Sequence, residues 1–170
     1  MNLVTAQIGG EHFRIADPDW ADPLDTSYGA HDGQRWNPAG LECLYLNSNL
    51  ATARANVARR FDRLPYGPED LDPATAPLLV TVDVPAGLAA DAYTDEGLSA
   101  AGLPMSYPLD SDGQLIAHTD CQPIGQAASD EGLDGIDRRS AAPGGTRELA
   151  WFPRDVKLQP RSRQPFEQWW

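Results

Sequence analysis

The 170-residue sequence predicts an α+β domain with a mixed or antiparallel sheet and flanking helices. Several segments of strand length are rich in apolar and β-branched residues, and one longer segment has apolar residues at helical spacing. Prolines and glycines are spread through the chain and indicate short elements joined by tight loops. Strands and helices do not alternate regularly, which disfavours a parallel sheet built from crossover helices. The length fits one compact domain, expected over residues 1–170.

The first part of the chain contains two expected strands separated by a long loop. Residues 12–15 form a short extended segment, and a loop rich in Asp and Pro follows through residue 32. The next apolar run, at residues 41–46, has the length of a strand. A helix follows with almost no intervening loop, so we expect this strand and this helix to pack as one unit.

Residues 48–63 predict an amphipathic helix. Either Ser48 or Asn49 can cap its first turn, and the helical pattern ends near Arg63. The apolar positions with helical spacing are Leu50, Ala53, Val57, Phe61 and Leu64. This spacing predicts one core-facing stripe, with Arg59 and Arg63 turned toward solvent.

The second half of the chain begins with a strand and continues with weaker patterns. Residues 78–84 alternate in polarity and are rich in β-branched side chains, which favours a strand. One short helix is expected near residues 95–101. Asp120 can cap another short helix through Ala128, which Gly132 would end.

Further strands are expected near the C-terminal end of the chain. Residues 135–140 are expected to form a strand, and residues 141–145, which contain Pro and Gly, are expected to form a loop. Residues 149–152 and 156–158 are predicted to pair with each other across a turn. The aromatic tail, residues 160–170, is expected to fold back on the domain or to contact another protein chain, because bulky aromatic side chains rarely stay exposed.

The acidic composition excludes some classes of partner. The formal net charge is −12, whereas proteins that bind nucleic acids rely on Lys and Arg to contact phosphates. All but one of the 13 basic residues are arginine, so a local site for a small phosphate-bearing ligand stays open. No apolar stretch is long enough to span a bilayer, and the N-terminus lacks the basic and apolar regions of a signal peptide. We therefore expect a cytoplasmic protein without a membrane or nucleic-acid partner.

The cysteine and histidine residues do not predict a metal site or a thiol nucleophile. Cys43 and Cys121 are too few and too isolated for a disulfide framework or a zinc site, and Cys43 lies in an apolar run. His12, His31 and His118 are scattered, with no spacing typical of metal ligands. We expect no bound metal.

A few polar and aromatic positions are candidates for a binding site. Arg35, in the turn-rich loop 33–40, could bind a phosphate through its forked guanidinium or pair with an Asp. Trp36 beside it could pack the loop or a base. Tyr45 could equally be an ordinary strand aromatic. Ser140, at a strand end without a Gly-x-Ser-x-Gly motif, could be a turn residue.

Taken in order along the chain, several motifs resemble the RES domain, which is named for an Arg, a Glu and a Ser. The motifs lie between about residues 11 and 155 and cover nearly the whole chain. They are His12-Phe13-Arg14-Ile15, Arg35-Trp36-Asn37-Pro38-x-Gly40, Leu44-Tyr45-Leu46, Gln122-Pro123-Ile124-Gly125 and Gly135-Ile136-x-x-x-Ser140. The Arg-Trp-Asn-Pro-x-Gly stretch with the downstream Tyr-Leu is the most specific, and the common order of the motifs supports the resemblance.

The resemblance implies a fold similar to ADP-ribosyltransferase domains and a substrate, NAD, whose nicotinamide–ribose bond is cleaved by phosphorolysis or hydrolysis. It also implies a toxin-like role, with a helix-turn-helix antitoxin as partner and inorganic phosphate as a further ligand; a homo-oligomer stays open. An alternative with the same chemistry is an ADP-ribosyltransferase that modifies a protein target. A third alternative is a catalytically impaired NAD-pocket module that acts by binding.

The family motifs assign roles to four residues by position. Arg35 would hold the phosphates or the ribose of NAD, with Trp36 beside it on the same NAD-binding surface. Tyr45 would pack near the nicotinamide, and Ser140 would form hydrogen bonds in the nicotinamide–ribose pocket. The resemblance therefore predicts that Arg35, Tyr45 and Ser140 line one concave pocket.

One position departs from the family pattern. The family Glu lies on the helix after the Tyr-Leu strand, and the corresponding residue here is Asn56. Cleavage of the glycosidic bond builds positive charge on the ribose, which a carboxylate stabilises and an amide does not. Without that charge, turnover is expected to fall by about 10²–10⁴-fold, and Asn56→Glu is expected to raise it. Another acid could substitute, and Glu42 on the preceding strand is the nearest in sequence.

Overall fold

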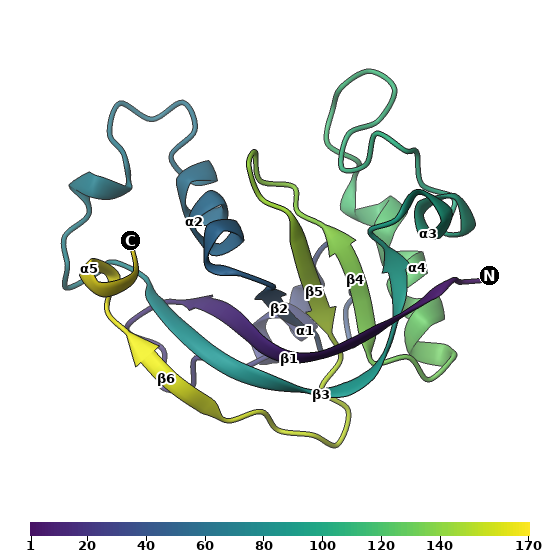
Figure 1. The fold of residues 1–170 in the computed structure, drawn as a ribbon, viewed down its shortest axis with the longest axis horizontal. Helices are drawn as coiled ribbons and strands as arrows, with labels where there is room; N and C mark the ends of the chain where they lie inside the picture. Colours follow the sequence, from purple (N-terminus) through teal and green to yellow (C-terminus); the bar gives the residue numbers. More distant parts are fainter.

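Six strands form one mixed sheet in the computed structural model, which describes residues 1–170 (Figure 1). They are β1 (Thr5–Ala16), β2 (Leu44–Asn47), β3 (Leu78–Ala92), β4 (Gly135–Arg139), β5 (Arg147–Trp151) and β6 (Pro160–Gln164). Their order in the sheet is β1-β2-β5-β4-β3-β6, and β1 also pairs with β3. The strands β1 to β5 therefore close into a ring, and β6 lies beside the first part of β3. Only β3 and β4 run parallel, so the fold is α+β, as the sequence predicts.

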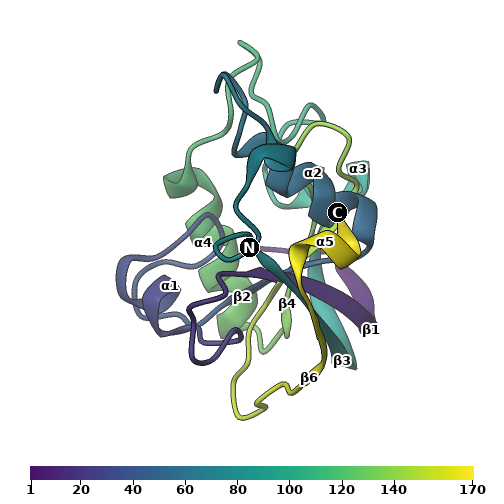
Figure 2. The same ribbon diagram turned by 90° about the vertical axis from the view of Figure 1, so that its left-hand side faces the viewer.

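Five α-helices flank the sheet (Figures 1 and 2). They are α1 (Ser27–Asp32), α2 (Leu50–Arg59), α3 (Asp95–Ala100), α4 (His118–Asp130) and α5 (Phe166–Trp169), and a 3-10 turn, η1, covers Pro68–Asp70. In Figure 1, α2 lies on one side of the turn between β4 and β5, and α3 and α4 lie on the other side. None of the helices is both long and apolar enough to cross a membrane.

The helix α2 begins where the sequence predicts and ends earlier. The Oδ1 of Asn49 accepts a hydrogen bond of 2.8 Å from the backbone N–H of Thr52, which caps the first turn. The helix ends at Arg59 and does not continue to Arg63, because Arg63 has a φ of 71° and this left-handed backbone cannot extend the helix. Arg63 is exposed, as expected, whereas Arg59 is half-buried.

A small core cluster joins α2 to the C-terminal tail. Val57 is fully buried in this cluster, and Leu50 and Phe61 pack against it, as their helical spacing predicts. Phe166 and Trp169 of α5 are buried in the same cluster. The aromatic tail therefore folds back on the domain, which was one of the two outcomes expected for it.

The strands β1 and β3 are longer than their sequence patterns predict. They pair antiparallel over almost their entire length, from Thr5 opposite Ala90 to Ala16 opposite Leu78. The part of β3 beyond Val84 ends in buried alanines, and such small side chains give little periodic signal in the sequence. The long pairing closes the ring of strands.

The predicted pairing of residues 149–152 with residues 156–158 is wrong. The strand β5 pairs antiparallel with β2 along one edge and with β4 along the other. A strand with both edges occupied cannot also form a hairpin with the segment that follows it. The last strand lies further along the chain, at β6, and pairs with β3.

Three other boundaries differ from the sequence prediction. The strand expected at residues 41–46 begins only at Leu44. The helix α1 occupies part of the loop expected through residue 32. The helix α4 begins at His118, before Asp120, and no side chain caps its first turn.

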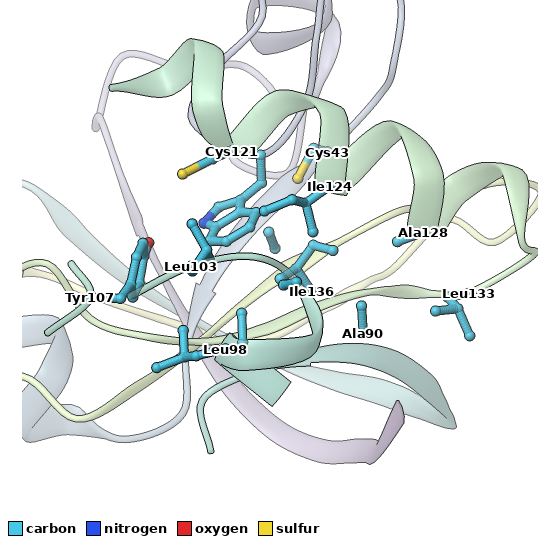
Figure 3. Close-up of a cluster of buried hydrophobic side chains, with 14 of the residues drawn as sticks. Cys43, Ala90, Leu98, Leu103, Tyr107, Cys121, Ile124, Ala128, Leu133 and Ile136 are labelled. Atoms are coloured by element: carbon cyan, nitrogen blue, oxygen red, sulfur yellow. The ribbon is translucent and has the colours of Figure 1, made fainter. Parts of the chain in front are cut away.

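The largest core cluster lies between α4 and the sheet, with the indole of Trp36 fully buried in it. Figure 3 shows Cys121 and Ile124 of α4 facing Ile136 of β4 across this cluster. Gly125 allows α4 to approach the loop that carries Trp36, because a Cβ atom at position 125 would overlap the carbonyl oxygen of Trp36. The packing of α4 on this loop therefore depends on a glycine in the middle of a helix.

Candidate active site

One face of the sheet carries a row of polar side chains from three neighbouring strands. Asn47 of β2 lies opposite Glu148 of β5, and Glu148 lies opposite Arg138 of β4. Opposite residues of neighbouring strands project from the same face and lie close enough to interact. The strand register therefore places an amide, a carboxylate and a guanidinium side by side, and all three residues are buried.

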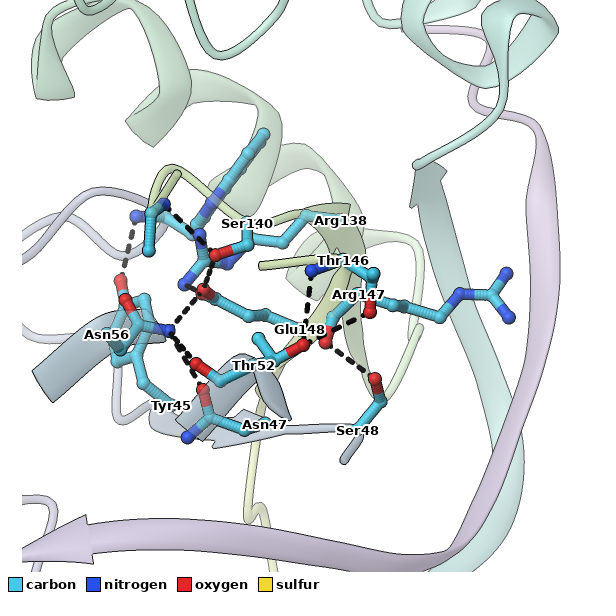
Figure 4. A network of polar contacts seen from close by, with 12 residues as sticks. Tyr45, Asn47, Ser48, Thr52, Asn56, Arg138, Ser140, Thr146, Arg147 and Glu148 are labelled. Atoms are coloured by element: carbon cyan, nitrogen blue, oxygen red, sulfur yellow. Dashed lines mark hydrogen bonds and ion pairs between the residues drawn. The ribbon is translucent and has the colours of Figure 1, made fainter. Parts of the chain in front are cut away.

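The carboxylate of Glu148 is the centre of a hydrogen-bonded network (Figure 4). Its Oε1 accepts hydrogen bonds from Nδ2 of Asn56, at 2.7 Å, and from the hydroxyl of Ser140, at 2.5 Å. Its Oε2 forms an ion pair with Arg138. Glu148 is only 5% exposed, so each of these donors compensates for water that the carboxylate has lost.

Arg138 supplies the buried positive charge of this network. Burial alone lowers the pKa of Arg138, but the carboxylate of Glu148 and, to a smaller extent, the phenols and thiol nearby raise that pKa above its ordinary value. The guanidinium also lies over the ring of Tyr45, 5.4 Å from its centroid. Arg138 therefore stays charged inside the protein, beside the carboxylate of Glu148.

Tyr45 connects this network to the Arg-Trp-Asn loop. Its hydroxyl accepts a hydrogen bond of 2.8 Å from the backbone N–H of Trp36 and donates one of 2.8 Å to Oδ1 of Asn37. Burial raises the pKa of Tyr45 well above its usual range, so the phenol stays neutral. Tyr45 therefore holds the loop onto β2 through two neutral hydrogen bonds.

Asn56 reaches the network from α2. Its Nδ2 donates to Oε1 of Glu148 and also, at 2.9 Å, to Oδ1 of Asn47. The start of α2 is fixed to β5, because the hydroxyl of Ser48 donates to the carbonyl of Arg147 at 2.7 Å. The amide nitrogen of Asn56 is thus directed at the sheet, and none of the hydrogen bonds in the structure uses its Oδ1.

Two cavities border this network. A small cavity of about 130 Å³ is lined by Tyr45, Asn56, Glu148 and Arg14, among others. A larger hollow of about 770 Å³ shares Arg14 and Tyr45 with it and carries the exposed aromatic side chain of Trp20 on its wall. Arg14 and Tyr45 therefore border both spaces.

Arg14 lines both cavities. Its Nη1 donates a hydrogen bond of 3.1 Å to the carbonyl of Tyr45, and its guanidinium lies 5.7 Å from the ring centroid of Trp20. Its buried Nε has no hydrogen-bond partner. Burial lowers the pKa of Arg14 from its ordinary value.

The structure brings together three of the residues that the sequence selects and separates the others. Asn56 and Ser140 meet at Glu148, and Tyr45 lies beside them through Arg138. Ser140 is buried and is not among the residues that line either cavity.

Arg35 and Trp36 lie apart from this network. The guanidinium of Arg35 donates a hydrogen bond of 2.6 Å to the carbonyl of Ile116, and Arg35 lines neither of the two cavities. The expected pocket shared by Arg35, Tyr45 and Ser140 is therefore not formed by these three side chains. Trp36 is 0% exposed and packs against Tyr107, which corrects its assignment from the NAD-binding surface to the core.

Sequence reasoning missed Glu148, Arg138 and Arg14 as site residues. Glu148 and Arg138 are charged residues at buried positions of β5 and β4, and a buried charge needs a partner. The nearest acid in sequence, Glu42, does not substitute for the family Glu. It is exposed and lines a separate hollow with Lys157.

The site holds no arrangement suited to metal or thiol chemistry. No group of three or more His, Cys, Asp or Glu side chains is placed to hold a metal ion. Burial raises the pKa of the Cys43 thiol to about 12, so this cysteine stays protonated and is a weak nucleophile. The chemistry of the site therefore depends on the carboxylate, the amides, the hydroxyls and the arginines.

Comparison with protein families matches residues 11–170 to the RES domain. No curated protein matches the chain. Among solved structures, the chain is similar to one from the crystal structure of the M. tuberculosis MbcT-MbcA toxin-antitoxin complex, with a TM-score of 0.75. The sequences are 22% identical, and the match covers 95% of this chain and 86% of the other. This likeness supports the fold.

Proposed function

The chain belongs to the RES domain family, and on this premise we propose that it binds NAD and cleaves the nicotinamide–ribose bond. The observation that carries the proposal is the convergence of Tyr45, Asn56 and Ser140, from three separate parts of the chain, around one buried polar network. Bond cleavage leaves positive charge on the ribose, and buried polar groups with fixed orientation stabilise such charge better than water does.

The sizes of the two cavities agree with a ligand that has a small and a large end. The cavity of about 130 Å³ is too small for a dinucleotide, whereas the hollow of about 770 Å³ lies in the range of ordinary ligand sites. We place the nicotinamide–ribose end near Asn56 in the small cavity and the adenosine end in the large hollow. Trp20 and Tyr28 are exposed aromatic side chains of that hollow and can stack on a base.

The test of this proposal is incubation of the purified protein with NAD, with and without inorganic phosphate. Release of nicotinamide only in the presence of phosphate identifies phosphorolysis, and release in its absence identifies hydrolysis. Transfer of label from NAD to protein supports the alternative, an ADP-ribosyltransferase. NAD that binds and stays intact would contradict the enzymatic proposal and leave a binding module.

A protein partner is part of the proposal. One solved structure with a similar fold is that of a toxin-antitoxin complex, and we propose that this chain is likewise a toxin neutralised by a helix-turn-helix antitoxin. The net charge of −12 favours a partner with a basic contact surface. Growth arrest on expression, relieved by coexpression of the antitoxin, is the expected result.

Arg35→Ala is expected to change the affinity for NAD by less than about twofold, which reverses the expectation from the sequence, because Arg35 lines neither of the cavities in which we place NAD. A tenfold change in the dissociation constant would correspond to about 1.4 kcal/mol. Calorimetric titration with NAD measures the effect, and the exposed Arg63→Ala is the matched control. A tenfold loss of affinity in Arg35→Ala alone would return Arg35 to the site.

A further inference from the structure

The structure places a carboxylate beside the position where the family glutamate is missing. Glu148 and Asn56 are 92 positions apart in the chain, but Oε1 of Glu148 lies 2.7 Å from Nδ2 of Asn56. Glu148 extends from β5 and Asn56 extends from α2, and both side chains line the same cavity of about 130 Å³. The cavity therefore contains a carboxylate even though α2 does not supply it.

The contact between these two side chains depends on which of them carries the charge. Asn56 donates a hydrogen bond to Glu148, which an ionised glutamate at position 56 could not do because a carboxylate only accepts. A second carboxylate at position 56 would lie within hydrogen-bond distance of the first, and two such carboxylates cannot both stay ionised. An amide on the helix and a carboxylate on the strand are thus a matched pair, in which a single negative charge sits on β5.

From this geometry we infer that Glu148 is the carboxylate that faces the ribose of NAD and stabilises its positive charge during cleavage. The inference rests on the proposed function. In that reaction the bond between ribose C1′ and the nicotinamide nitrogen breaks, and its electron pair leaves with nicotinamide. An oxygen of water or phosphate then bonds to C1′, and the water oxygen releases its proton to solvent. Glu148 keeps its charge throughout and forms no bond.

The neighbours of Glu148 act as positioning residues. Arg138 and Ser140 hold the carboxylate from the side of the sheet, and Asn56 holds it from the helix. The Oδ1 of Asn56 accepts no hydrogen bond within the protein and can accept one from a ribose hydroxyl. Glu148 therefore supplies the negative charge, and Asn56 orients the sugar.

The test compares nicotinamide release by the natural protein with that of Glu148→Gln, Asn56→Glu, the double variant Asn56→Glu/Glu148→Gln and the control Glu42→Gln. Glu42 is the matched control because it undergoes the same chemical change in an exposed position outside both cavities. Steady-state kinetics separate kcat from KM, and thermal unfolding reports whether each variant is folded.

Glu148→Gln is expected to lower kcat by roughly a hundredfold or more, with KM changed by less than about threefold, because the charge matters most in the transition state. Asn56→Glu alone is expected to lower turnover, which reverses the expectation from the sequence. The double variant returns one carboxylate to the cavity and is expected to be at least about tenfold faster than Glu148→Gln. Glu42→Gln is expected to match the natural protein.

Other outcomes would overturn the inference. A folded Glu148→Gln protein with kcat within about threefold of the natural one removes Glu148 from the chemistry, as does an increase in turnover on Asn56→Glu alone. If Glu148→Gln does not fold, the double variant decides: turnover within about tenfold of the natural protein supports the inference, and a folded, inactive double variant contradicts it. Absence of nicotinamide release by the natural protein would instead contradict the proposed function.

Discussion

Arg138→Met is expected to destabilise the protein by about 3–5 kcal/mol, because it leaves the carboxylate of Glu148 buried without its cation. Such a loss is a large part of the stability of a domain of this size. Urea denaturation, followed by the fluorescence of the buried tryptophans, measures the effect. The matched control is Arg161→Met, which breaks ion pairs that are about half exposed and is expected to cost about 0–1 kcal/mol.

A double variant separates the cost of the unpaired charge from the loss of packing around Arg138. Removal of both charges in Arg138→Met/Glu148→Gln is expected to cost less than Arg138→Met alone, since a buried ion pair adds little net stability over neutral side chains. If the double variant is less stable than the single one, the carboxylate is not the cause, and the account of the network in Figure 4 fails.

Gly125→Ala is expected to destabilise the protein by about 3 kcal/mol, although alanine is the better helix former by about 1 kcal/mol. The added Cβ would overlap the carbonyl oxygen of Trp36, and a backbone atom cannot move aside as a flexible side chain can. For a domain of this length the unfolding midpoint is expected to fall by about 6–12 °C. Turnover should fall as well, because the displaced loop carries the hydrogen-bond partners of the Tyr45 hydroxyl.

Gly29→Ala is the matched control for this substitution. Gly29 also lies in a helix, but a Cβ there would meet only the side chain of Gln34, at an ordinary distance of 3.7 Å. This control is expected to change the unfolding midpoint by no more than about 2–4 °C, the shift that corresponds to about 1 kcal/mol. Equal midpoints for Gly125→Ala and Gly29→Ala would show that α4 can shift without cost and that its approach to Trp36 is not tight.

The elements that could be predicted from the sequence are those whose signals are local. The cap at Asn49 and the apolar stripe of α2 depend on residues within a few positions of one another. The cap is confirmed, and the stripe is confirmed as far as Phe61, whereas Leu64 lies beyond the end of the helix and is exposed. The long pairing of β1 with β3 depends on residues more than sixty positions apart. No pattern within either segment indicates its pairing partner. The sequence therefore predicted both strands to be shorter than they are.

The candidate site shows the same division between local and distant signals. The family motifs selected Tyr45, Asn56 and Ser140, and the structure brings these residues to one network. Glu148 became a site residue only through the register of β5 against β2 and β4, which no single segment determines. Trp36 illustrates the opposite error, because an aromatic residue beside a candidate phosphate-binding arginine is equally suited to a core.

The closed ring of strands has a consequence for the protein while it is being synthesised. The small cavity takes Arg14 from β1, Asn56 from α2 and Glu148 from β5, so its walls come from both ends of the chain. Domains made from distant segments form only after the later segment has been translated. A ribosome-bound chain that stops before β5 has neither the carboxylate nor a closed ring. A nascent chain therefore cannot carry out the proposed cleavage until β5 has been translated.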